Sequence, residues 1–147
     1  MTPGGQLLLV GCGKMGGAML RGWLQRGVAA RDVFVVEPNS ATLGDLSGAG
    51  VTIIADAASL PAGLAPSVVV LAVKPQMMDA AIVAYQRFVR PETVFLSIAA
   101  GRTIGYFERM LGAGAAIVRS MPNTPAAVGR GITVACANRL VSAAQRA

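Results

Sequence analysis

The 147-residue sequence contains no histidine and only two cysteines, Cys12 and Cys136, which lie far apart and form no C-x-x-C pair. Both shortages argue against a zinc site and against a disulfide framework, because each needs a cluster of such residues. The absence of histidine also excludes a histidine-based triad and any dehydrogenase that uses histidine as its base. We therefore expect no metal, and we interpret Cys12 as a packing residue rather than a nucleophile.

Charged residues make up only 14% of the chain and aromatic residues 5%, and no apolar run approaches the length of a membrane span. The hydrophobic content of 54% favours one folded α/β domain over a disordered chain. The 13 basic residues give a formal net charge of +6, but they are scattered and lack interleaved aromatics. We therefore expect neither nucleic acid nor a membrane as a partner. The N-terminal segment lacks a basic leader, so we expect a soluble, cytoplasmic protein.

The most informative stretch is Leu7 to Leu24, where an apolar run ends on Gly11-Cys12-Gly13-Lys14-Met15-Gly16 and an apolar-periodic segment follows. This order predicts a strand, a tight turn and a helix, the context that a dinucleotide-binding turn requires. Gly11 would adopt backbone angles closed to other residues, Gly13 would leave room for a pyrophosphate, and Gly16 would allow close packing of helix and strand. The unpaired N–H groups at the start of the helix would face the phosphates. A plain strand-to-helix turn is the alternative.

The second predicted strand, residues 32–36, ends at Glu37. An acidic side chain at this position can accept hydrogen bonds from an adenosine ribose and repels a 2′-phosphate, which favours NAD over NADP. Asn39 could donate to a phosphate. Its simpler role is to cap a helix that runs to about residue 49.

Strands are further predicted at 51–54, 67–73, 93–98, 115–119 and 132–136, with helices over 78–89, over 104–111 and from 140 onward. The unbroken run at 67–73 is typical of a central parallel strand buried on both faces. The pattern predicts an α/β fold of the Rossmann type, a doubly wound and mostly parallel sheet with helices on both faces. We place an NAD(P)-binding domain at residues 1–137 and the start of a truncated helical segment at 138–147.

Four blocks carry a resemblance to a known family: residues 11–16, Ala72-Val73-Lys74-Pro75-Gln76, Ser97-Ile98-Ala99-Ala100-Gly101 and Arg119-Ser120-Met121-Pro122-Asn123-Thr124-Pro125-Ala126. In this order and spacing the chain resembles pyrroline-5-carboxylate reductase. That family passes hydride from NADPH or NADH to the cyclic imine 1-pyrroline-5-carboxylate and so makes L-proline. It has an N-terminal Rossmann domain and a C-terminal helical domain that mediates dimerisation and larger assembly. The resemblance implies that the helical domain is absent here and that the full-length protein is a homo-oligomer.

The resemblance also implies a set of site residues. The pyrophosphate would lie on the turn, the adenosine and ribose near residues 72–75, and the nicotinamide ribose near residues 98–100. The cofactor-binding residues, including those argued above, are Val10, Gly11, Cys12, Gly13, Lys14, Met15, Gly16, Glu37, Asn39, Ala72, Val73, Lys74, Pro75, Ile98, Ala99 and Ala100. Pro122, Asn123 and Thr124 would border the nicotinamide and the imine. The cofactor is then NADP or NAD, with Glu37 favouring NAD.

The catalytic residues stay unknown at this point, because in the family most contacts to the substrate carboxylate come from the helical domain. Lys74 could act as an acid, although a cofactor or structural contact is its simpler role. We expect these 147 residues to bind dinucleotide but to turn over little substrate. Two alternatives stay open: a non-catalytic NAD(P)-binding module and a dehydrogenase acting on hydroxy acids.

Overall fold

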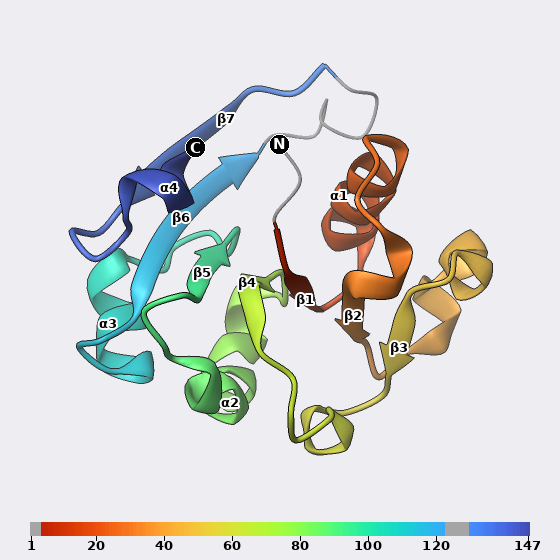
Figure 1. Ribbon diagram of the computed structural model, residues 1–147, viewed down its shortest axis with the longest axis horizontal. Coiled ribbons are helices and arrows are strands. Elements are labelled where there is room, and N and C mark those ends of the chain that lie inside the picture. Colours follow the sequence, from red (N-terminus) through yellow and green to blue (C-terminus); the bar gives the residue numbers. More distant parts are fainter. Residues whose placement is uncertain (1–3, 123–129) are drawn as a thin grey trace.

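A computed structural model describes residues 4–122 and 130–147 of the chain. Within these residues the strands form one seven-stranded sheet in the order β3-β2-β1-β4-β5-β6-β7 (Figure 1). The strands are β1 (Gln6–Val10), β2 (Val33–Val36), β3 (Thr52–Ile54), β4 (Pro66–Leu71), β5 (Val94–Ser97), β6 (Ala116–Pro122) and β7 (Thr133–Ala137). Strands β1 to β6 pair in parallel, and β7 pairs antiparallel with β6. The predicted Rossmann-type fold is confirmed.

Helices cover both faces of this sheet, because the chain crosses over one face between β1 and β2 and over the other between β4 and β6 (Figure 1). The α-helices are α1 (Lys14–Gln25), α2 (Met78–Ile82), α3 (Ile104–Leu111) and α4 (Ala143–Arg146). Helix α1 packs on one face through Leu20, with Met19, Trp23 and Leu24 partly buried beside it. Helices α2 and α3 pack on the opposite face. Each face therefore has its own hydrophobic cluster, as a doubly wound sheet requires.

Gly27 ends α1 as predicted. It has φ +92°, a conformation that side chains disfavour. The N–H of Val28 then donates to the carbonyl of Trp23 at 3.1 Å, the long backward bond of a helix-terminating turn.

The helix predicted over residues 39–49 is wrong. Two short 3-10 turns stand there instead, η2 (Ser40–Thr42) and η3 (Gly44–Gly48). Gly44, the first residue of η3, has φ +51°, which interrupts a right-handed helix. The capping role of Asn39 is confirmed, because its side chain accepts from the N–H of Ala41 at 3.1 Å.

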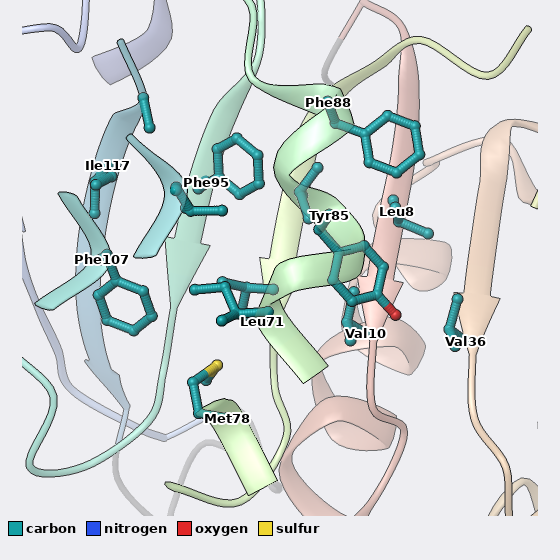
Figure 2. Packing of buried hydrophobic residues seen from close by; sticks show 14 of the residues in the cluster. Leu8, Val10, Val36, Leu71, Met78, Tyr85, Phe88, Phe95, Phe107 and Ile117 are labelled. Carbon is teal, nitrogen blue, oxygen red and sulfur yellow. The ribbon is translucent and has the colours of Figure 1, made fainter. Parts of the chain in front are cut away.

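The single helix predicted over residues 78–89 is also only partly correct. After one turn of α2 the chain tightens into a 3-10 helix, η6 (Val83–Phe88). A 3-10 helix places every third residue on one side, so Ile82, Tyr85 and Phe88 are buried, whereas Val89 is only partly buried. In Figure 2 the rings of Tyr85 and Phe88 project from this segment into the cluster that contains Leu8 and Val10.

The C-terminal residues pack against the sheet. Asn138 is buried; its amide donates to the carbonyl of Ala115 at 2.9 Å and its side-chain oxygen accepts from the N–H of Ile117 at 3.1 Å. Helix α4 starts at Ala143, later than expected, with Ser142 as its capping residue. The domain boundary at residue 137 stays a prediction. Over the described ranges, no helix is long and apolar enough to cross a membrane.

Candidate functional site

The carboxyl ends of β1, β2, β4, β5 and β6 meet at one edge of the sheet, which brings the loops with the predicted site residues together (Figure 1). The first loop contacts both neighbours, because Gly11 N–H donates to the Val36 carbonyl at 2.9 Å and Ala72 N–H to the Val10 carbonyl at 2.8 Å. The predicted residues at this edge are Val10–Gly16, Glu37, Asn39, Ala72–Pro75, Ile98–Ala100 and Pro122. Asn123 and Thr124, also predicted, lie outside the described residues. This edge is where open α/β sheets bind ligands.

The glycines of the turn meet different surroundings. Gly11 has φ +89°, and a Cβ there would lie 3.0 Å from the backbone of Ala72 and Val73. A Cβ at Gly16 would lie 2.5 Å from the carbonyl oxygen of Gly11, closer than real Cβ atoms approach. Two of the three glycines are thus needed by the fold of the turn itself, which folds back tightly against the start of α1.

Gly13 differs, because a Cβ there would meet no described residue within 4 Å other than its two chain neighbours, and the residue has φ −72°. Among the described residues, no side chain caps the N-terminus of α1 and none in its first turn is acidic. The first N–H groups of α1, at the positive end of the helix dipole, are therefore available to an anion. An exposed Gly13 beside an uncapped helix start has the shape and charge that a pyrophosphate needs.

Glu37 lies beside this turn, half-buried, with both carboxylate oxygens hydrogen-bonded to backbone. Oε2 accepts from the N–H of Cys12 at 2.8 Å, and Oε1 accepts from the N–H of Asn39 at 2.8 Å. Glu37 therefore fixes the glycine turn to the end of β2, a role that sequence reasoning missed. Since each carboxylate oxygen can accept a second bond, these contacts are compatible with recognition of a ribose.

Cys12 is fully buried in the cluster beneath α1, in agreement with the packing role expected for it. Burial raises the pKa of its thiol, and the nearby Glu37 carboxylate raises it further. The thiol therefore stays protonated at neutral pH, the unreactive form. The part of the chain that the structure describes contains no group of three or more Cys, Asp or Glu side chains that could hold a metal ion.

Two arginines fix the loops on the other side of the edge, and neither was predicted as a site residue. Arg119 in β6 donates to the carbonyl of Ala99 at 2.7 Å, and Arg102 donates to the carbonyl of Pro75 at 2.9 Å. Lys74 is exposed beside Pro75, and none of the described residues forms a hydrogen bond or ion pair with its ammonium group. Both arginines lie next to predicted site loops in the sequence, and this position is the signal that could have identified them.

An open cavity of about 890 Å³ runs between the flank of α1 and the carboxyl ends of β5 and β6. Lys14, Arg21 and Arg26 line it together with Ser120 and Pro122, and no acidic residue is among its described lining residues. Arg21 is paired with Asp45, so Lys14 at the start of α1 is the lining cation nearest to the glycine turn, whereas Arg26 lies at the other end of the helix.

This geometry agrees with what the chain is similar to. The protein-family model described as "NADP oxidoreductase coenzyme F420-dependent" matches residues 6–101, nearly two thirds of the chain. The chain belongs to this family. The matched residues include the glycine turn, Glu37 and the loops that follow β4 and β5.

Among curated proteins, the chain is 34% identical to pyrroline-5-carboxylate reductase of Pseudomonas aeruginosa over 145 residues, which cover 98% of this chain and 52% of that protein. The solved pyrroline-5-carboxylate reductase of Coxiella burnetii superposes with a TM-score of 0.88 at 28% identity, over 97% of this chain and 53% of that one. The Plasmodium falciparum pyrroline carboxylate reductase, solved with NADP bound, shares the fold with a TM-score of 0.82 at 24% identity, over 99% and 53%.

The resemblance to the N-terminal NAD(P)-binding domain of pyrroline-5-carboxylate reductase is thereby confirmed. The chain spans about half the length of the curated relatives it matches.

Proposed function

We propose that this chain is the cofactor-binding part of a pyrroline-5-carboxylate reductase, which reduces 1-pyrroline-5-carboxylate to L-proline with NADH or NADPH. The observation that carries the proposal is the 34% identity to such a reductase over 98% of the chain. The exposed Gly13 beside the uncapped start of α1 supports the cofactor half of the proposal independently of any relative.

The residues at the sheet edge have separate tasks in this function. The bound dinucleotide supplies the hydride. The turn around Gly13 holds its pyrophosphate, Glu37 and residues 72–75 lie toward the adenosine, and residues 98–100 lie toward the nicotinamide ribose. Pro122 ends β6 beside the open cavity, where it would border the imine. A protonated imine is already electrophilic, so the site needs to place it and exclude water more than to activate it. This explains how a chain without histidine can contribute to the reaction.

We further propose that Glu37 makes NADH the better cofactor of this chain. Its carboxylate is fixed at the end of β2 by two 2.8 Å hydrogen bonds and cannot swing away freely from a 2′-phosphate. Calorimetric titration with NADH and NADPH tests this. Glu37→Gln, which removes the charge and keeps one acceptor oxygen, should move the ratio of the two Kd values toward NADPH about tenfold, roughly 1.4 kcal/mol.

The control is Glu92→Gln, which changes the same charge at an exposed position before β5, far from the carboxyl edge. It should leave the ratio unchanged. Tighter binding of NADPH than NADH by the parent chain would contradict the cofactor preference, and no binding of either would contradict the proposed function.

We propose that catalysis and assembly need the helical half that full-length relatives possess. Large apolar side chains stand exposed at the β6–β7 border, with Met121 at 43% and its register partner Val134 at 64%. Neighbouring apolar exposure of this kind marks a surface that a further segment or subunit covers. The 147 residues alone should therefore bind dinucleotide without forming proline from 1-pyrroline-5-carboxylate. Proline formation at an enzymatic rate by this chain alone would contradict the requirement for that half.

A further inference from the structure

A cluster of three side chains and one backbone carbonyl joins the loop after β4 to the loop after β5. It consists of Pro75, Asp79, Arg102 and Tyr106, and we refer to it as the Arg102 cluster. Nη2 of Arg102 donates to the Pro75 carbonyl at 2.9 Å and lies 3.5 Å from Oδ1 of Asp79. The guanidinium also lies over the Tyr106 ring, with Cζ 4.6 Å from the ring centroid. The Tyr106 hydroxyl donates to the same Asp79 oxygen.

The cluster lies at the edge of the hydrophobic core, where only the Tyr106 ring packs against it. The Arg102 side chain is 27% exposed and that of Asp79 66% exposed, and exposed ion pairs add little to folding stability. However, Arg102 directly follows Gly101, which turns the chain with φ +73°, so the guanidinium stands at the base of the loop that contains residues 98–100. Its bond to Pro75 spans to the loop that contains residues 72–75. The cluster therefore connects these two loops while adding little to the stability of the domain.

We propose that Arg102 is a positioning residue for the dinucleotide: it fixes the distance between the loop facing the adenosine side and the loop facing the nicotinamide ribose. The inference rests on the proposed function, because that function assigns the two loops to the two ends of one cofactor. A ligand that spans both loops gains from their fixed spacing, since less ordering remains to be done on binding. A ligand that touches only the adenosine side gains nothing from it.

The test measures the Kd of NADH, or of NADPH if the parent chain binds it more tightly, and the Kd of AMP, for the parent chain and for Arg102→Ala. We expect Arg102→Ala to weaken the dinucleotide about tenfold and AMP less than twofold, with the unfolding midpoint within about 3 °C of the parent. Arg109→Ala is the matched control, because it removes the same charge from an exposed position on α3. It should leave both Kd values unchanged.

Arg102→Lys separates positioning from charge. A lysine keeps the positive charge that would attract phosphates, but it lacks the planar fork that reaches a carbonyl and a carboxylate together. We expect it to recover less than half of the lost affinity, measured as log Kd; full recovery would overturn the inference. It also serves as the test variant if Arg102→Ala does not fold.

Two further results would overturn this inference and leave the proposed function standing. They are an unchanged dinucleotide affinity in Arg102→Ala and an equal loss of affinity for AMP and the dinucleotide. Absence of dinucleotide binding by the parent chain would overturn the proposed function and this inference with it.

Discussion

The two sides of the carboxyl edge are fixed by different kinds of contact. On the β1–β2 side, backbone approaches backbone so closely that a methyl group at Gly16 would lie 2.5 Å from the Gly11 oxygen. On the β4–β6 side, the loops are connected by the long side chains of Arg102 and Arg119, which donate to the carbonyls of Pro75 and Ala99.

The difference teaches which changes each side tolerates. A turn fixed by close backbone packing fails when atoms are added, because the interior cannot expand to make room. Loops connected by guanidinium groups fail when donors are removed, because the carbonyls lose partners while the backbone path stays possible. The first side is therefore sensitive to size, and the second to charge and hydrogen bonding.

The largest effect should come from Gly16→Ala on the first side. Alanine normally stabilises a helix relative to glycine, but here its Cβ would press on the backbone oxygen of Gly11. We expect a loss of about 3 kcal/mol in the free energy of unfolding, measured by urea denaturation. Gly22→Ala in the same helix is the control: beyond the helix's own backbone, its Cβ would meet none of the described residues within 4 Å, so it should stabilise by about 0.5–1 kcal/mol. Equal effects of the two substitutions would contradict the sensitivity of the first side to added atoms.

Gly13→Leu should next separate binding from folding within the same turn. Apart from its chain neighbours, no described residue lies within 4 Å of a Cβ at Gly13, so the fold should survive, while the side chain fills the space assigned to the pyrophosphate. We expect dinucleotide affinity to fall at least 100-fold, about 3 kcal/mol, in calorimetric titration. Gly63→Leu, also in open space but in the connection before β4, should leave affinity unchanged. Undiminished binding by Gly13→Leu would show that no pyrophosphate lies on this turn.

A smaller effect concerns how the free energy of unfolding depends on pH, through a tyrosine on the sheet face that carries α2 and α3. Tyr85 belongs to the buried cluster on the α2–α3 face, and burial raises the pKa of its hydroxyl to about 12. Because this pKa exceeds the unfolded value near 10, the stabilisation is fully present below pH 10 and is lost as pH rises toward 12. Denaturant unfolding across this range should show a loss of roughly 2.5 kcal/mol from this residue. Tyr85→Phe should reduce the pH dependence by that amount; an unchanged profile would contradict the prediction.

The parts of the fold that sequence predicted well are those fixed by local chemistry. The glycine turn, the end of α1 at Gly27 and the buried strand β4 were predictable because each depends on backbone angles or on a run of apolar residues. The segment at 39–49 was predicted as an α-helix because Asn39 is a typical capping residue, and the segment at 78–89 because its apolar spacing fits a helix. Their 3-10 geometry depends on Gly44 and on the packing of Tyr85 and Phe88 against the sheet.

The sequence by itself determined that a strand, a glycine turn and a helix stand in an order suited to a dinucleotide, because these features need only neighbouring residues. Only the tertiary structure decided how the site is fixed: Glu37 bonds the N–H of Cys12 25 residues away, Arg102 reaches Pro75 27 residues away, and Arg119 reaches Ala99 20 residues away. The sheet order makes these side chains neighbours, and whether a long side chain meets a given carbonyl depends on the packing of whole elements.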